Sequence, residues 1–249
     1  YEHRFSARLY NTTQLSFTRY KYKLGVSSEE KSATKQDKME FGLTYDSYIM
    51  DVMFQTNYEW RPNNRHEIHF GANYTYHMFR PQVGRMGFTN TDTVTTTMDT
   101  TFSIGRTHHT HELNLYIEDT YTPCHWFKLN AGLHATLYHA DGRFYPSVEP
   151  RLGMRFLPHK DVAIKMSYAY MSQYVHMLSN SSLSLPTDLW VPITADIPPM
   201  RSMQAAVGLT YNVCNQVELS VEGYYKKMIN LLEYKDGASL CRKCKICRC

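Results

Sequence analysis

Residues 127–138 read FKLNAGLHATLY, with apolar side chains at the odd positions and polar, small or amphipathic ones at the even positions. Alternation over this length is typical of a β-strand with one apolar and one polar face. The same period recurs at residues 66–79, 161–170 and 203–211, and no segment shows a convincing helical period. The sequence therefore predicts an all-β protein built from long antiparallel strands.

Two kinds of connection separate the alternating segments. We expect about nine strands, at 13–25, 47–60, 66–79, 111–121, 127–139, 147–157, 161–175, 202–213 and 217–234. Short polar turns are predicted at 61–65, 122–125, 158–161 and 214–216, and longer links at about 26–46, 80–110, 140–146 and 178–201. This rhythm is typical of an outer-membrane β-barrel, whose periplasmic turns are tight and whose extracellular loops are long.

The net charge is concentrated at one end of the chain. The 249 residues include 27 Lys and Arg, 23 Asp and Glu and six Cys, for a net charge of +4. Four of these basic residues and four of these cysteines fall in the last ten residues, where no acidic residue occurs, so the rest of the chain is neutral. A neutral body argues against a nucleic-acid-binding protein, and its two cysteines argue against a disulfide scaffold. The absence of a long apolar run excludes a membrane helix but not a membrane β-barrel.

The polar strand faces require contact with water. Glu149, Arg151 and Arg155 alternate with apolar residues, and Lys165 lies on the polar face of the following strand. Charges on one face of many long strands favour a wide lumen over a small filled barrel. We therefore interpret these four residues as lumen-facing, with Glu149 and Arg151 paired within the lumen wall.

Aromatic residues support the same architecture. Trp60 and Trp126 lie beside short turns, whereas Tyr20 and Tyr74 lie toward the opposite strand ends. Amphipathic rings favour the membrane–water boundary, so these residues are expected to form two girdles. The alternative is the general preference of aromatic residues for strands.

Short signatures in a fixed order bear a resemblance to a known family. They are IMD at 49–51, HMFRP at 77–81, PSVEPRL at 146–152, LPTDLW at 185–190, IPP at 197–199, VEGYYK at 221–226 and NLLEYKD at 230–236. With these, the chain resembles the barrel of a TonB-dependent outer-membrane receptor of the Bacteroidetes type over roughly residues 1–236. The resemblance implies an antiparallel transmembrane β-barrel segment with short periplasmic turns and long extracellular loops.

The resemblance also carries expectations about the whole protein. The family barrel has 22 strands around a plug, and about nine strands cannot close it. We therefore expect an internal fragment: residues 1–238 as a partial barrel, with the plug domain and final strands absent. The implied function is TonB-dependent import of a siderophore, haem, cobalamin, peptide or glycan across the bacterial outer membrane. The implied partners are the lipid bilayer and, through the missing plug region, the TonB–ExbB–ExbD complex.

Two other functions are also compatible with the alternating sequence. A soluble or surface-attached all-β module that binds glycans would explain the alternation by a sandwich core. A small, self-standing porin-like barrel is the third possibility. The sequence contains no Gly-rich phosphate loop, nucleophile elbow or zinc-protease motif, so we expect neither an enzyme nor a cofactor.

Candidate ligand-binding residues lie mainly in the predicted loops 80–110 and 178–201. Trp190 is the first candidate because an aromatic ring in a long loop can stack on a ligand ring; the alternative is packing of the loop on the barrel rim. Arg80 is a second candidate. His109 and His111 share a strand face and could hold a metal-containing ligand, or they form a solvated strand end.

The last residues form a separate segment. Cys241, Cys244, Cys247 and Cys249 could together bind zinc or an iron–sulfur centre, but four ligands within nine residues leave little chain for a tetrahedral site. We therefore predict no metal site and interpret residues 239–249 as a non-native or frameshifted tail.

Overall fold

The computed structural model describes residues 1–31, 38–91, 95–102, 107–178, 189–194, 197–214, 217–233 and 247–248. Its strands are β1 (Glu2–Ser6), β2 (Leu9–Lys31), β3 (Lys38–Asn63), β4 (His66–Thr91), β5 (Thr95–Phe102), β6 (His108–Cys124), β7 (Phe127–Ala140), β8 (Arg143–His159), β9 (Val162–Gln173), β10 (Val175–Leu178), β11 (Leu189–Pro192), β12 (Met200–Cys214), β13 (Val217–Ile229), β14 (Leu232–Glu233) and β15 (Cys247–Arg248). The predicted all-β class is confirmed. No helix among the described residues is long and apolar enough to span a bilayer.

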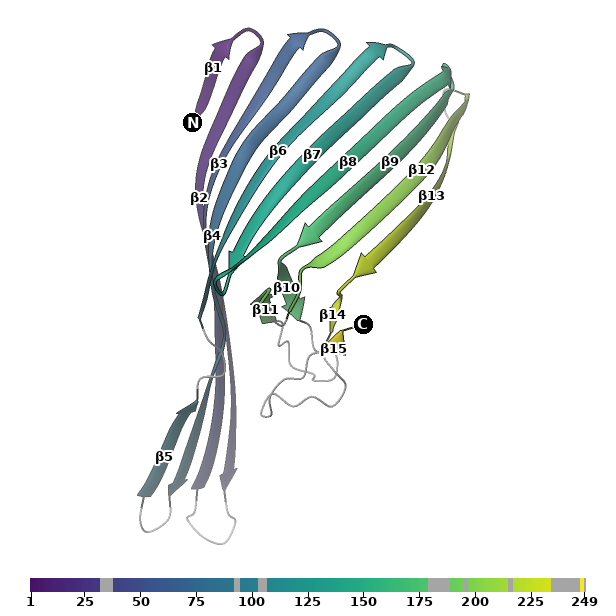
Figure 1. The fold of residues 1–249 in the computed structure, drawn as a ribbon. Coiled ribbons are helices and arrows are strands. Elements are labelled where there is room, and N and C mark those ends of the chain that lie inside the picture. Colours follow the sequence, from purple (N-terminus) through teal and green to yellow (C-terminus); the bar gives the residue numbers. More distant parts are fainter. Residues whose placement is uncertain are drawn as a thin grey trace.

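Ten strands form one open, curved sheet in the order β1-β2-β3-β4-β6-β7-β8-β9-β12-β13, and β5 pairs with β4 as the eleventh strand (Figure 1). Every pairing in this sheet is antiparallel. The nine predicted strands correspond to β2–β4, β6–β9, β12 and β13, whereas β1 and β5 were missed. In the described part of the chain, β1 and β13 are edge strands that do not pair with each other.

Tight turns gather at one end of the sheet. The β3–β4, β6–β7 and β8–β9 connections lie together at the top of Figure 1. At the β3–β4 turn, the side-chain Oδ1 of Asn63 accepts hydrogen bonds from the backbone N–H groups of Arg65 and His66 at 2.8 and 3.1 Å. The predictions of short turns at 61–65, 122–125 and 158–161 are confirmed; the fourth, 214–216, lies partly outside the described residues.

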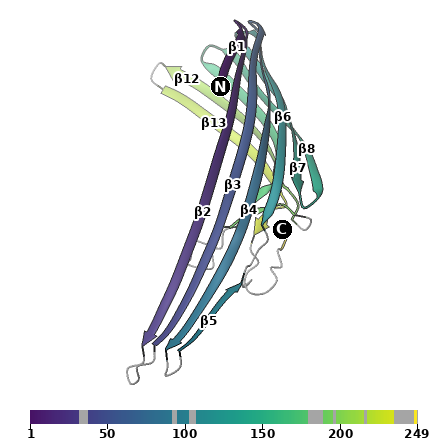
Figure 2. The same cartoon turned by 90° about the vertical axis from the view of Figure 1, so that its left-hand side faces the viewer.

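The opposite end differs from the prediction in two ways. The expected link at 140–146 is a two-residue turn, because Asp141 and Gly142 adopt positive φ angles of 48° and 74° that suit a tight hairpin. Much of the expected loops 26–46 and 80–110 is strand, since β2, β3 and β4 continue and β5 joins them. These strands extend together beyond the rest of the sheet as an arm (Figure 2).

The two faces of the sheet differ in chemistry. On one face, Leu15, Phe54, Tyr74, Leu113 and Leu137 form a row across β2, β3, β4, β6 and β7, and all five are exposed. One residue along each strand, the opposite face carries a polar row of Gln55, Asn73, Asn114, Thr136 and Ser147. The predicted apolar and polar faces are therefore present, and β3, β4, β6 and β7 contribute to both rows.

The β10–β11 hairpin shows which face is concave. It follows β9 in the chain but contacts β4, which it can reach only by crossing the inside of the curved sheet. Among the described residues, the buried apolar cluster forms where this segment packs on the polar face, around Tyr138, Ala140, Tyr174 and Ile193. The polar face is thus the concave inner face, and the apolar face is the convex outer face.

The outer-face position that a girdle requires is found for only some of these aromatic residues, and their place at a membrane boundary stays a prediction. Trp60 and Tyr74 lie on the outer face, and Trp126 packs edge-on against outer-face Phe156 at a centroid distance of 5.5 Å. The prediction for Tyr20 was wrong, because its side chain lines a pocket on the inner face. Along β2 the odd-numbered residues Leu15 and Phe17 point to the outer face, so the even-numbered Tyr20 points to the inner face.

Gly71 on β4 lets the neighbouring strands approach closely. A Cβ at this position would meet the backbone O of Thr56, and it would lie 2.9 Å from Cε1 of Tyr116 and 3.0 Å from Oδ1 of Asn57. The Tyr116 hydroxyl donates to that same Asn57 Oδ1 at 2.8 Å, so the ring crosses over the glycine.

We predict that Gly71→Ala destabilises the protein by about 1–3 kcal/mol, because a rigid backbone oxygen and a hydrogen-bonded ring must move. The midpoint of urea-induced unfolding measures this loss. Gly223→Ala is the matched control, since a Cβ there meets no atom within 4 Å. Equal midpoints for the two variants would contradict the prediction.

Candidate ligand-binding site

A pocket of about 630 Å³ lies on the inner face between the sheet and the β10–β11 hairpin. Its described lining comes from β2 (Thr18, Tyr20), β3 (Ile49, Asp51), β4 (His77, Phe79), β10 (Val175, Met177) and β11 (Trp190). Most of these side chains are apolar or aromatic, whereas the polar members lie together on the sheet. This volume and composition are typical of small-molecule sites.

The hairpin places Trp190 over the inner face. Met177 pairs with Trp190 across the β10–β11 ladder, and Val175 pairs with Pro192. The backbone N–H of Ile193 donates to the Tyr174 carbonyl at 2.9 Å, which continues the hairpin ladder by one residue pair toward the end of β9. Trp190 keeps 37% of its surface exposed, so the ring is held in place but remains available to a ligand.

Packing behind the hairpin supports this position. The rings of Tyr138 and Tyr174 stack at 4.8 Å with an interplanar angle of 7°. The Tyr145 hydroxyl donates to the Thr194 carbonyl at 3.2 Å. His176 on β10 is buried, and this burial lowers the pKa of its imidazole, although a hydrogen bond with the backbone of Pro198 acts in the opposite direction.

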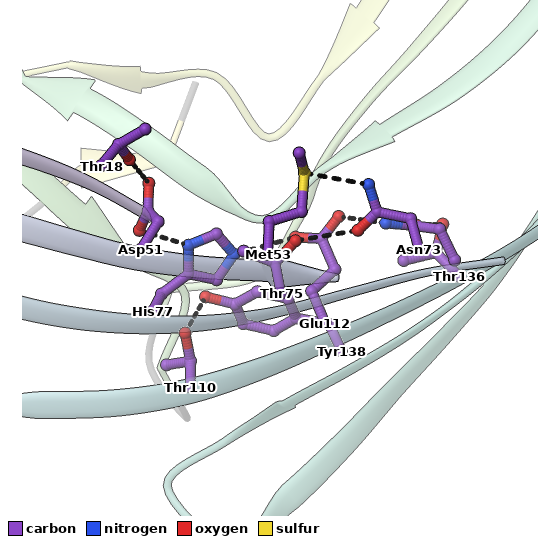
Figure 3. Close-up of polar contacts among 11 residues, drawn as sticks. Thr18, Asp51, Met53, Asn73, Thr75, His77, Thr110, Glu112, Thr136 and Tyr138 are labelled. Atoms are coloured by element: carbon purple, nitrogen blue, oxygen red, sulfur yellow. Dashed lines mark hydrogen bonds and ion pairs between the residues drawn. The ribbon is translucent and has the colours of Figure 1, made fainter. Parts of the chain in front are cut away.

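Asp51 and His77 form the polar base of the pocket, and Glu112 on a third strand lies beside His77 without bordering the pocket (Figure 3). His77 donates from Nδ1 to Oδ1 of Asp51 at 2.8 Å, and its Nε2 lies 3.6 Å from Oε2 of Glu112. Thr18 donates to the other Asp51 oxygen, Oδ2, at a longer 3.4 Å. The imidazole therefore lies between two carboxylates.

Further hydrogen bonds extend this base along the wall (Figure 3). Asn114 donates to Oε1 of Glu112 at 2.8 Å, and Thr136 donates to Oδ1 of Asn114 at 2.7 Å. Buried Tyr138 donates to Thr110 at 2.9 Å. The chain of bonds from Thr136 through Asn114 to Glu112 joins β7 to β6 and holds the Glu112 carboxylate beside His77.

The four predicted lumen residues all lie on the inner face. Buried Glu149 accepts a hydrogen bond from Ser147 at 2.8 Å, and its Oε2 lies 3.9 Å from Nη2 of Arg151. Arg155 and Lys165 are direct cross-strand partners on β8 and β9. These positions agree with the expected polar wall, and none of the four residues lines the Trp190 pocket.

Other predicted ligand-binding residues lie on the outer face. The guanidinium carbon of Arg80 lies 5.8 Å from the ring centroid of Tyr48, to which Arg80 is paired across the ladder. His109 and His111 share a strand face, as expected, but their Nδ1 atoms lie 2.6 and 2.7 Å from the hydroxyls of Tyr76 and Tyr74. Ligand binding by Arg80, His109 and His111 stays a prediction, which this placement does not favour.

Most of the cysteine-rich tail lies outside the described residues, so its predicted lack of a metal site stays a prediction. Cys241, Cys244 and Cys249 lie outside the described residues, and Cys247 belongs to the short strand β15, of which only the backbone is described. No group of three or more His, Cys, Asp or Glu side chains suited to a metal occurs within the described ranges.

The residues at the base of the pocket were not predicted as a site. Asp51 and His77 fall in the segments quoted for the family resemblance, and Glu112 directly follows His111 in the sequence. The alternation along each strand places each of them on the polar face. Whether they lie close together depends on the registers between β3, β4 and β6. Alternation within one strand carries no information about those registers.

Comparisons with known proteins agree with this architecture. A family model described as the β-barrel of TonB-dependent receptor-like proteins matches residues 1–241. No curated protein sequence matches the chain. Because the family match ends at residue 241, the predicted boundary at 238 and the non-native tail stay predictions.

Several solved structures share the fold. The RagAB peptide transporter superimposes with a TM-score of 0.61 at 11% identity, covering 92% of this chain and 29% of that one. FpvA of Pseudomonas aeruginosa, bound to pyoverdines, gives 0.61 at 14% identity over 94% of this chain and 32% of that one. The FrpB iron transporter of Neisseria meningitidis gives 0.53 at 13%, with coverages of 93% and 40%. The chain thus spans about a third of the length of these structures.

We predict that Asp51 and His77 stabilise the wall cooperatively. In a double-mutant cycle of Asp51→Ala and His77→Ala, urea unfolding should give a coupling free energy of about 1–3 kcal/mol, because the hydrogen bond joins an imidazole to a carboxylate. Asp51→Ala combined with Lys165→Ala is the control, since these residues lie on the distant strands β3 and β9. Additive effects for Asp51 and His77 within about 0.5 kcal/mol would contradict this prediction.

Proposed function

Because the chain belongs to the TonB-dependent receptor-like β-barrel family, we propose that it forms one arc of the wall of an outer-membrane receptor that imports a solute with energy supplied through TonB. The observation that supports this most strongly is the pocket on the inner face, which combines an aromatic side chain held by an inward hairpin with a polar wall. Its position suits capture of a solute from the extracellular side.

The chemistry of the two faces supports a membrane location. The convex face exposes Leu15 and Val221 at 75% and 74% of their surface, together with rows of other large apolar residues. Lipid removes such surface from water, whereas a soluble glycan-binding module would leave a large apolar patch hydrated. The concave face, lined by hydroxyl, amide and charged groups, suits an aqueous lumen.

The steps of import divide between this arc and the rest of the receptor. The hairpin and the inner wall hold the solute, and the convex face keeps the arc in the bilayer. Energy from TonB moves a plug and opens a path along the polar wall toward the tight-turn end. The similar structures are described as transporting peptides or iron or as binding pyoverdine, so fold similarity alone does not select a solute.

Leu209 and Thr210 test which face meets lipid. Leu209 lies on the outer face between Ile164 and Val221, and Thr210 points to the inner face. Leu209→Arg should reduce the fraction of receptor assembled in the outer membrane, because an Arg on the lipid face costs about 2–4 kcal/mol near the bilayer centre. Thr210→Arg should assemble normally. Assembly is measured as the fraction of receptor that resists carbonate extraction and changes its electrophoretic mobility on heating. A greater loss of assembled receptor for Thr210→Arg than for Leu209→Arg would reverse the assignment of the lipid-facing side.

Uptake assays test the import function. Cells with and without the receptor, each with TonB intact or deleted, should be offered labelled oligopeptides, a ferric siderophore, haem and cobalamin. One class should accumulate only when receptor and TonB are both present. Equal accumulation without TonB would indicate a passive pore, and no dependence on the receptor for any class would refute import of these solutes.

A further inference from the structure

We propose that the Trp190 pocket binds a cationic amphipathic group, an apolar or aromatic moiety that carries an ammonium, as at the amino end of a peptide. The inference rests on the proposed import function and specifies the chemical class of the solute. It follows from three properties of the pocket: the apolar surface that remains exposed, the net charge of its base, and the location of the nearby cations.

The side of the pocket formed by the β10–β11 hairpin offers exposed apolar surface. Trp190 and Met177 border the pocket there, and 37% and 49% of their surfaces remain exposed. Phe79 and Ile49 face them from the sheet, and Phe79 is already fully buried. A ligand gains by covering the exposed indole and thioether, so its outer portion should be apolar or aromatic. The indole face also favours a nearby cation.

The Asp51–His77–Glu112 group at and behind the base of the pocket is negatively charged whatever the state of its histidine. Asp51 and Glu112 contribute two negative charges, and His77 between them contributes at most one positive charge. Glu112 does not border the pocket itself, and the described lining residues other than Asp51 and His77 are uncharged. Either protonation state of His77 therefore leaves at least one net negative charge, which attracts an ammonium and repels a carboxylate or an anionic iron complex.

One carboxylate oxygen remains available for the ammonium. Asp51 Oδ1 is occupied by His77 at 2.8 Å, whereas Oδ2 accepts only the long bond from Thr18 at 3.4 Å within the described residues. The Asp51 side chain is 29% exposed and borders the pocket. An ammonium group carries three donors and can complete the coordination of Oδ2.

The neighbouring guanidinium groups do not neutralise this base. Arg19 and Arg80 occupy the same part of β2 and β4, but both lie over the Tyr48 ring, at 5.5 and 5.8 Å from its centroid. Arg80 is the direct partner of Tyr48, and it follows inner-face Phe79 by one residue, which places the Tyr48 cluster on the outer face. The sheet thus separates these cations from the pocket.

Three peptides with the same apolar groups and different charges test the proposal. The probes are Phe-Ala-Ala-amide with a free amino group, its N-acetyl form and its N-succinyl form, which carry one positive, no and one negative charge. Binding to the detergent-purified full-length receptor is measured by titration calorimetry. Affinity should fall in that order, with about tenfold between the first two, the ratio that corresponds to one favourable charge contact of about 1.4 kcal/mol.

Substitutions assign the effect to the pocket. Asp51→Asn should lower the affinity for the amine about tenfold while the acetyl form changes less than about twofold, and this unchanged affinity shows that the pocket remains folded. Trp190→Ala should weaken all three probes. Glu222→Gln, on the inner face but in a separate hollow with Lys165, is the control and should change nothing. Tighter binding of the succinyl form, no binding of any probe at millimolar concentration, or charge discrimination that survives Asp51→Asn would each overturn the proposal.

The results separate this inference from the import function. TonB-dependent uptake of an anionic iron complex, without charge-ordered peptide binding, would refute the ligand class and leave import standing. Charge-ordered binding without any TonB-dependent uptake would refute import and leave the pocket assignment standing.

Discussion

Register between neighbouring strands is the constraint on which this architecture depends. Where their side chains are described, the strands of the main sheet carry apolar side chains on one face and polar side chains on the other, and paired strands share this assignment. A slip of one residue in a single pairing would turn a strand's apolar set to the inner face and its polar set to the outer face. Tight turns fix the pairing at one end, and cross-strand hydrogen bonds such as that from Thr136 to Asn114 fix it further along.

The same constraint explains where a site can form. A wall that is one sheet thick has no interior, so side chains on its inner face become buried only where another segment covers them. The β10–β11 hairpin and the residues after it that the structure describes, 193, 194 and 197, supply that cover, and Phe79, Tyr138 and Ile193 are buried where the two pack together. The pocket therefore lies where an inward hairpin meets the polar wall, and both components are needed to define it.

The sequence was sufficient for the fold class, the nine longest strands and the inner-face position of Glu149, Arg151, Arg155 and Lys165, because all of these depend on a period of two. Extending the parity of Leu113 and Leu115 would also have placed His109 and His111 on the outer face. The Asp51–His77–Glu112 group could not be predicted, since it requires two registers between strands. Strands β10 and β11, with four residues each, are too short for a period to be seen. Strand β11 lies within the expected loop 178–201, and β10 runs from the end of the expected strand 161–175 to the start of that loop.

The unequal length of the strands has a consequence for what meets the receptor first. β3 and β4 contain 26 residues each, or about 85 Å of extended chain at roughly 3.3 Å per residue. A tilted strand crosses the hydrocarbon core with about 10 residues. In the membrane orientation proposed above, the remaining residues of β2–β5 project some tens of ångströms beyond the bilayer on the side opposite the tight turns. A macromolecule approaching from that side would contact this arm before the proposed solute pocket, so the two binding surfaces are physically separate.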